Sequence, residues 1–315
     1  MSGSIVCGID GSQESLAAAT VAARLAERLG SRLVLAHVLE ASTRFPYGHE
    51  FQAERRWRRA GGRVTSLFER IERRLSEVEA DRRVLHGAPA RALQVLAAEE
   101  EAALLVVGSR GRGALTAAVL GSVSSAVAQA SDGPVVIVPP NAAQVSGSDQ
   151  RDRSTVVCGV DGSDEAKAAA RVAARLAGVL GLELVLVHAY EPGPSAAAIP
   201  APGVGPPIDQ EALDERQREG AWSLLEAVAR DIEEAPTELR VELGAAASAL
   251  DRSAQDEHAE LIMVGGHGWG PLSSGLLGST SARLAACASR PVVVVPQGAS
   301  LPLEKTIDAE SGRLR

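Results

Sequence analysis

The sequence has few aromatic residues, few cysteines and no long apolar run. Phe, Trp and Tyr make up 3% of the 315 residues although 45% are hydrophobic, so a core must be built mainly from Ala, Val and Leu. Three cysteines are too few for a disulfide framework and indicate a reducing compartment. Cys7 and Cys158 lie within apolar runs, which predicts small buried side chains and not reactive thiols.

The chain also lacks the segments that direct a protein to a membrane or a nucleic acid. No apolar run approaches the roughly 18 residues of a membrane span, and no signal peptide is expected at the N-terminus. The net charge of −8 argues against a nucleic-acid surface. The Arg-rich segment 54–75 is interpreted as a solvated helix face, because acidic residues are interleaved with its arginines. We therefore expect a cytoplasmic protein without membrane or nucleic-acid partners.

The sequence contains an internal repeat of one unit. The stretch IVCGIDGSQESLAAAT from residue 5 matches VVCGVDGSDEAKAAAR from residue 156. The offset is 151 residues for Asp10 and Asp161, and 157 residues for Gly108 and Gly265. The second copy therefore gains six residues, which we assign to the Pro/Gly-rich stretch 191–207 because that composition favours a loop.

The repeat predicts the domain organisation. Two domains are expected at residues 1–140 and 154–297, each large enough for its own core. A polar, turn-rich linker is expected at 141–153. A loosely ordered tail is expected at 298–315.

Periodicity alternates within each copy between short apolar runs and longer helical patterns. Such alternation predicts an α/β fold with a parallel sheet covered by helices on both faces. The strands expected in the first copy are 4–9, 33–38, 82–86, 103–107 and 134–138. The helices expected there are 13–29, 50–79, 89–100 and 122–130.

A glycine-rich loop follows the fourth predicted strand of each copy, at 108–122 and 265–279. Glycine permits positive φ and lets a ligand approach closely, and the N-terminus of the next helix, for which Ser122 is the predicted N-cap, attracts phosphate. The loop is neither a Walker A motif nor the dinucleotide fingerprint. A flexible connection is the alternative for a single copy; the duplication favours phosphate binding.

An aspartate ends the first predicted strand of each copy, in GIDGS (8–12) and GVDGS (159–163). Asp-Gly-Ser is a turn in which Asp or Ser caps the following helix. If strands one and four are neighbours, Asp10 and Gly108 flank one crevice at the carboxyl ends of the strands, where ligands bind. Asp10 and Asp161 are then candidates to accept hydrogen bonds from a ribose.

The spacing Gly-x2-Gly-x9-Gly-Ser resembles the ATP-binding motif of the universal stress protein family. It occurs in both copies, and the two aspartates match an early acidic position of that family. The resemblance covers residues 3–139 and 154–296 and is to the tandem subgroup. It implies Rossmann-like domains, each with a five-stranded parallel sheet of order 3-2-1-4-5, and one ATP per domain, with Mg²⁺ brought by the nucleotide.

The resemblance also implies the residues of each site. In the first domain these are Gly8, Asp10, Val38, Gly108, Arg110, Gly111, Arg112, Gly113, Gly121, Ser122 and Val123. In the second domain these are Gly159, Asp161, Ala189, Gly265, His267, Gly268, Trp269, Gly270, Gly278, Ser279 and Thr280. Val38 and Ala189 are expected beside adenine. His267 and Trp269 replace two arginines of the first copy, so the second site is expected to bind phosphates differently.

The last predicted strand of each copy, 134–138 and 291–295, is apolar throughout. A bare apolar edge invites aggregation. The resemblance implies that the two edges pair within the chain as a pseudo-dimer, and that the chain forms a homodimer.

Three functions stay open for such a chain. It is expected to be a nucleotide-dependent regulator in stress response or growth control; the alternatives are a weak ATPase and a nucleotide-independent scaffold. Neither glycine-rich loop contains Asp or Glu, so we predict no catalytic residue and no enzyme. No Cys/His cluster has the spacing of a metal site.

Overall fold

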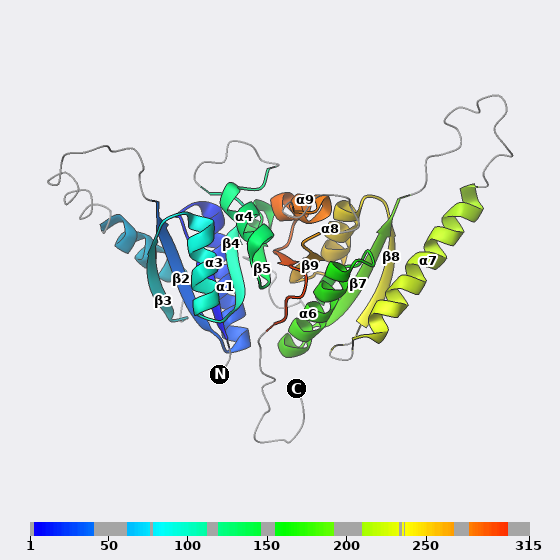
Figure 1. Cartoon of the computed structure of the whole chain (residues 1–315), viewed down its shortest axis with the longest axis horizontal. Coiled ribbons are helices and arrows are strands. Elements are labelled where there is room, and N and C mark those ends of the chain that lie inside the picture. The colour runs from blue at the N-terminus through cyan, green and yellow to red at the C-terminus, as the bar shows by residue number, and fades with distance from the viewer. Residues whose placement is uncertain are drawn as a thin grey trace, which may run out of the picture.

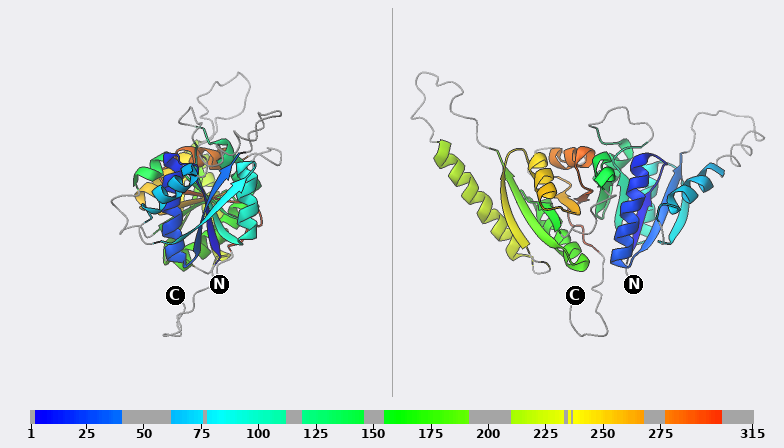
Figure 2. Two further views of the ribbon diagram at one scale, coloured as in Figure 1. Left: turned by 90° about the vertical axis from the view of Figure 1, so that its left-hand side faces the viewer. Right: turned by 180° about the vertical axis from the view of Figure 1, so that it is seen from behind.

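The computed structural model describes most of the chain as two similar α/β halves that lie side by side (Figures 1 and 2). None of the described helices is long and apolar enough to cross a membrane. The residues described are 3–40, 62–75, 78–111, 119–145, 155–191, 210–232, 235, 237–267 and 277–301.

The N-terminal half, up to residue 145, alternates strands and helices. Its elements are β1 (Ser4–Gly8), α1 (Gln13–Leu29), β2 (Arg32–Leu39), β3 (Ala80–His86), α3 (Pro89–Glu99), β4 (Ala102–Gly108), α4 (Ser122–Ala130), β5 (Val135–Val138) and α5 (Pro140–Val145). Residues 62–72 are also helical.

The C-terminal half, from residue 155, follows the same order. Its elements are β6 (Thr155–Gly159), α6 (Asp164–Leu180), β7 (Glu183–Tyr190), α7 (Gln210–Arg230), β8 (Thr237–Leu243), α8 (Ala246–Asp256), β9 (Leu261–Gly265), α9 (Ser279–Cys287) and β10 (Val292–Val295).

The sheet confirms the α/β fold, but its strand order is not fully that predicted, which was one five-stranded sheet of order 3-2-1-4-5 in each domain. The strands form one ten-stranded sheet in the order β3-β2-β1-β4-β5-β10-β9-β6-β7-β8. Each half contributes parallel strands, and β10 pairs with β5 antiparallel, with Val293 opposite Val136. Each of these edge strands is buried along its whole length. Joining them removes two apolar edges from solvent, so the prediction of an internal pseudo-dimer is confirmed.

The predicted linker and the predicted tail both contain ordered chain. Residues 140–145, most of which belong to the predicted linker 141–153, form α5, which begins with proline and whose Ala142 is buried. The predicted tail begins with ordered chain, because Leu301 is 4% exposed and belongs to the core. The predicted helix 50–79 is described only in part: residues 73–75 form a turn, and residues 50–61 lie outside the described residues.

The first helix of each half begins and ends by the same means. Ser12 caps α1 by accepting from the backbone N–H of Ser15, and Gly30 ends it in the left-handed conformation. Ser163 and Gly181 do the same for α6. Alanines dominate the buried stripe of both helices and allow close approach to the sheet.

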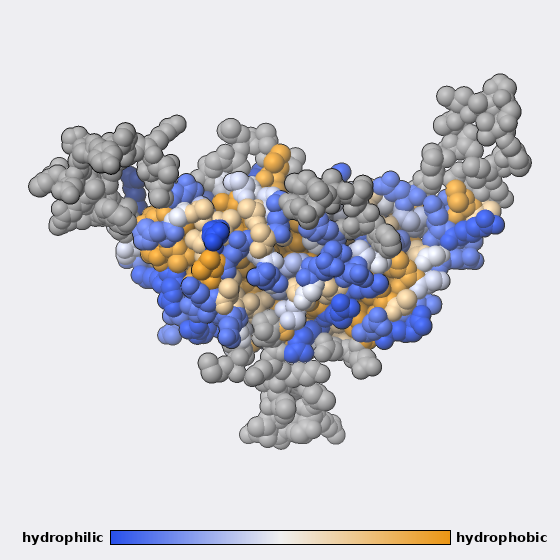
Figure 3. Space-filling view, viewed as in Figure 1, coloured by the Kyte–Doolittle hydropathy of each residue, from blue (hydrophilic) through white to orange (hydrophobic). Residues whose placement is uncertain are grey.

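Helices cover both faces of the sheet, as predicted. The segment 62–75, α1, α6 and α7 pack on one face, and α3, α4, α8 and α9 pack on the other. On the side shown in Figure 3, apolar surface gathers around α3, where Val95 is 48% exposed.

Thiol reactivity provides a test of the core. Cys7 and Cys158 are fully buried, which confirms their predicted packing role, and burial raises the pKa of the Cys158 thiol to about 12 and that of Cys7 further. Because the thiolate is the reactive form, we expect a disulfide reagent at pH 8 to modify only the exposed Cys287. Absorbance should count one thiol in the native chain and three in denaturant; fast labelling of two or three native thiols would contradict this packing.

Candidate nucleotide site

The N-terminal half has a cavity at the carboxyl ends of β1 and β4, where the order of the parallel strands reverses. Its volume of about 720 Å³ lies within the range of small-molecule sites. Nine of the residues predicted for this half line it: Gly8, Asp10, Val38, Gly108, Arg110, Gly111, Gly121, Ser122 and Val123. Arg112 and Gly113 lie outside the described residues.

Asp10 stabilises a turn and lies beside the glycine-rich loop. Its Oδ1 accepts from the backbone N–H of Ser12 (2.9 Å) and from its hydroxyl (2.6 Å), so it stabilises the turn that starts α1. Its Oδ2 faces Gly111, where an added Cβ would lie only 2.7 Å away. The carboxylate therefore joins β1 to the glycine-rich loop at the cavity wall.

The glycines that end β1 and β4 make room for neighbouring protein atoms. A Cβ on Gly108 would lie 2.8 Å from the carbonyl carbon of Glu14, and a Cβ on Gly8 would lie 2.8 Å from Leu93. Neither Gly108 nor Gly111 adopts positive φ, so that expectation is wrong for them. The left-handed angle falls instead at Gly11 (φ 87°), in the turn before α1.

Gly121, and not Ser122, is the N-cap of α4. It has extended backbone (φ −65°) and no side chain that could cap the helix, whereas Ser122 is the first helical residue, so the predicted cap is wrong. Ser124 donates its hydroxyl to the carbonyl oxygen of Ser109 (2.7 Å) and closes the loop onto the helix. The first turn of α4 therefore lines the cavity, and no side chain caps its N-terminus.

One cation of the loop is held at the cavity. Arg110 lines it, and its Nε lies 4.0 Å from a carboxylate oxygen of Glu14 on α1. The two side chains are 15% and 22% exposed, so the pair is largely shielded from solvent. Glu14 was missed in the sequence because an acid in the first turn of a helix is common for helix-dipole reasons alone.

Another part of the cavity wall is mainly apolar, with Glu40 next to it in the chain. Val38 and Leu39 of β2 line it together with Leu93 of α3. His37 also lines it and bonds through Nδ1 to the carbonyl oxygen of Ile9 (2.7 Å), which ties β2 to β1. Leu93 was missed, although the repeat places Leu250 at the same position of the second copy.

The C-terminal half repeats this geometry where it is described. Asp161 accepts from Ser163 as Asp10 does from Ser12. A Cβ on Gly265 would lie 2.9 Å from the carbonyl carbon of Glu165. The remaining predicted residues are placed as follows: Gly159 packs on Leu250, Ala189 lies in β7, His267 lies two residues after the end of β9 with a buried Nε2, Gly278 is the N-cap of α9, Ser279 and Thr280 begin that helix, and Gly268, Trp269 and Gly270 lie outside the described residues.

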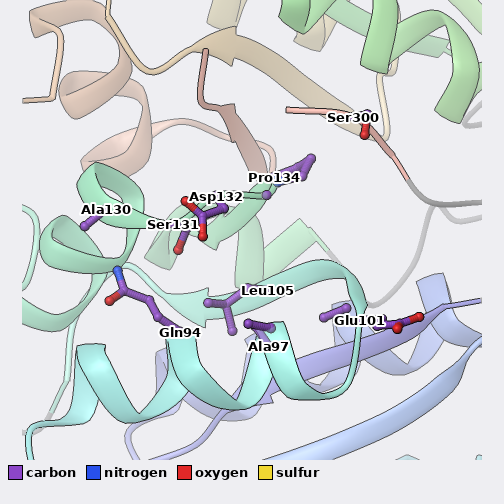
Figure 4. A pocket seen from close by; sticks show the side chains of 12 residues that line it. Gln94, Ala97, Glu101, Leu105, Ala130, Ser131, Asp132, Pro134 and Ser300 are labelled. Carbon is purple, nitrogen blue, oxygen red and sulfur yellow. The ribbon is translucent and has the colours of Figure 1, made fainter. Parts of the chain in front are cut away.

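A second cavity of about 250 Å³ lies at the amino end of β5, between α3, the preceding loop and Ser300 (Figure 4). Glu101 and Asp132 line it. None of the residues predicted for the nucleotide sites lines this second cavity.

Two five-stranded parallel units, each with a glycine-rich loop between its fourth strand and the next helix, define a tandem Rossmann-like α/β protein. The sequence model of the universal stress protein family matches residues 1–139 and 153–296. The chain belongs to the universal stress protein family.

Relatives of known name agree with this assignment. A universal stress protein of Mycobacterium tuberculosis is 31% identical over 307 residues, which cover 93% of this chain and 97% of that protein. A shorter one from Thermus aquaticus is 38% identical over 142 residues, 45% of this chain and 97% of its own length. The crystal structure of a universal stress protein from Archaeoglobus fulgidus shares the fold, with a TM-score of 0.62 and 21% identity, and covers 95% of this chain and 100% of its own.

Proposed function

We propose that the chain is a regulator that binds an adenine nucleotide, with one site in each half. The observation that carries the proposal is the convergence on one cavity of Asp10, the loop glycine Gly111, the uncapped first turn of α4 and Arg110. Backbone N–H groups at a helix N-terminus and a neighbouring guanidinium are the groups that bind phosphate.

Two parts of the cavity wall suit the two ends of ATP. The polar part, at Gly111 and Ser122, would hold the phosphates, and the mainly apolar part at Val38 would hold adenine. Asp10, also on the wall, would accept from the ribose hydroxyls. Any Mg²⁺ would be held by phosphates and water, because the described residues contain no group of three potential metal ligands.

The alternatives are disfavoured by specific features. Hydrolysis needs a positioned base beside the phosphates, and neither glycine-rich loop contains Asp or Glu; His267 is a candidate in one half alone. A scaffold would need Gly8 and Gly108 for packing. At position 121 the contact is milder, since a Cβ would lie 3.1 Å from the carbonyl oxygen of Ser109, and glycine there leaves the α4 N-terminus without a side-chain cap.

Mass spectrometry of the small molecules released by denaturing the freshly purified chain tests the proposal. Recovered ATP supports a regulator, and ADP that accumulates with time supports turnover. If no nucleotide is released and calorimetry detects no binding of added ATP, ADP or AMP, the proposal is refuted and the nucleotide-independent scaffold is the function supported.

Asp10→Ala is expected to lower the affinity of the N-terminal site for ATP about tenfold, a loss equal to about 1.4 kcal/mol. The same variant removes the acceptor of Ser12, so the free energy of unfolding should fall by about 1 kcal/mol. Calorimetry and urea unfolding measure the two effects, and Asp161→Ala is the matched variant for the other site. Unchanged ATP affinity in Asp10→Ala would remove this carboxylate from the binding role.

A further inference from the structure

A buried carboxylate joins the two halves beside the β5–β10 seam. Glu260, directly before β9, is 2% exposed and pairs with Arg28 and Arg24 of α1; the Nε of Arg24 lies 3.3 Å from its Oε1. A second nitrogen of Arg28 donates to the carbonyl oxygen of Leu180, the last residue of α6 (2.8 Å). One cluster therefore ties α1 of the N-terminal half to α6 and β9 of the C-terminal half.

Comparison of the two copies shows that the cluster has no equivalent at the symmetry-related position of the seam. Glu260 aligns with Ala103, which is fully buried in β4, and the two arginines of α1 align with Arg175 and Val179 of α6. The reciprocal position across the seam therefore has a methyl group where the cluster has its carboxylate. The apolar pairing of β5 with β10 is nearly symmetric, so it does not distinguish one half from the other.

The charges do distinguish them. Two N-terminal halves paired through β5 would bring four α1 arginines toward Ala103 with no carboxylate, and removing charges from water without a partner is costly. Two C-terminal halves would leave each Glu260 with the single arginine at position 175. The pairing of unlike halves gives this carboxylate two arginines.

We propose that the Arg24–Arg28–Glu260 cluster is the specificity determinant of the seam: it makes the β5 edge accept the β10 edge of a C-terminal half and reject a second N-terminal half. The proposal is independent of nucleotide binding. Because β5 and β10 are paired within the chain, a homodimer of the full chain would need a different surface.

Glu260→Arg in the full chain tests the proposal by placing three cations in the seam. Hydrogen exchange at the amides of β5 and β10 should accelerate at least tenfold, and light scattering should show association through the released edges. Arg24→Glu combined with Glu260→Arg restores two cations and one carboxylate. It also keeps the hydrogen bond from Arg28 to the carbonyl oxygen of Leu180. Exchange in this double variant should return to within about threefold of the parent.

Glu100→Arg is the matched control, because Glu100 also pairs with two arginines, Arg32 and Arg83, but within one half. It should leave exchange in β5 and β10 unchanged. Exchange and mass that stay at the parent values in Glu260→Arg, or a double variant no closer to the parent than the single, would overturn the proposal. If Glu260→Arg does not fold, Glu260→Gln replaces it, and unchanged seam exchange there counts against the cluster equally.

Discussion

Replacing Gly108 with alanine is expected to lower the free energy of unfolding by about 2 kcal/mol, the typical cost of overpacking. The new methyl group would lie 2.8 Å from backbone and Cβ atoms of Glu14, which a helix fixed at its capped N-terminus cannot easily move. Gly265→Ala should have a similar effect against Glu165. Urea unfolding followed by circular dichroism measures the change.

Gly133→Ala is the control for this effect. A Cβ at Gly133 would have no neighbour within 4 Å, and its φ is not positive, so stability should stay within about 0.5 kcal/mol of the parent. If Gly108→Ala were as stable as Gly133→Ala, the tight contact between the end of β4 and α1 would be refuted.

Gly121→Asp is expected to weaken ATP binding at the N-terminal site about 100-fold, or roughly 2.7 kcal/mol. Gly121 already has N-cap backbone angles, so an aspartate there can accept from the first-turn N–H groups of α4. It would thereby occupy the proposed phosphate donors and add a negative charge beside them. The cap should offset the tight fit of the new Cβ, which would lie 3.1 Å from the carbonyl oxygen of Ser109.

Gly121→Ala separates charge from bulk, because it adds the same Cβ without a carboxylate. Calorimetry should show less than a tenfold loss of affinity for this variant. Gly121→Asp should melt close to the parent temperature, and Gly121→Ala should melt below it because it has the tight Cβ without the cap. Equal losses of affinity in the two variants would assign the effect to bulk. No loss in either would remove the α4 N-terminus from the site.

The fold was largely predictable because its signals are local. The capping serines and closing glycines delimit α1 and α6, and continuous apolar runs predict the central strands, as observed. The structure departs from these expectations where tertiary contacts override composition. Helix α5 has the polar sequence of a linker but packs Ala142 into the core. The pairing of β5 with β10 was expected because each apolar edge strand needs a partner.

The location of the candidate site could be predicted from the sequence, but the role of each residue in it could not. The repeat identified Asp10 and the glycine-rich loop, and the structure brings them to one cavity. The sequence could not show that Gly108 is required by Glu14, because the two residues are far apart in the chain and meet only through packing. Leu93 was missed because a leucine in an amphipathic helix does not reveal whether it faces a core or a ligand.

Equilibrium dialysis of the nucleotide-free chain against labelled ATP tests the central claim most directly. We expect saturation at two ATP molecules per chain, and in Gly121→Asp we expect one of the two to bind with about 100-fold lower affinity than in the parent. A chain that is folded by circular dichroism and retains no ATP at millimolar concentration, or a Gly121→Asp variant that still binds two with parental affinity, would contradict it.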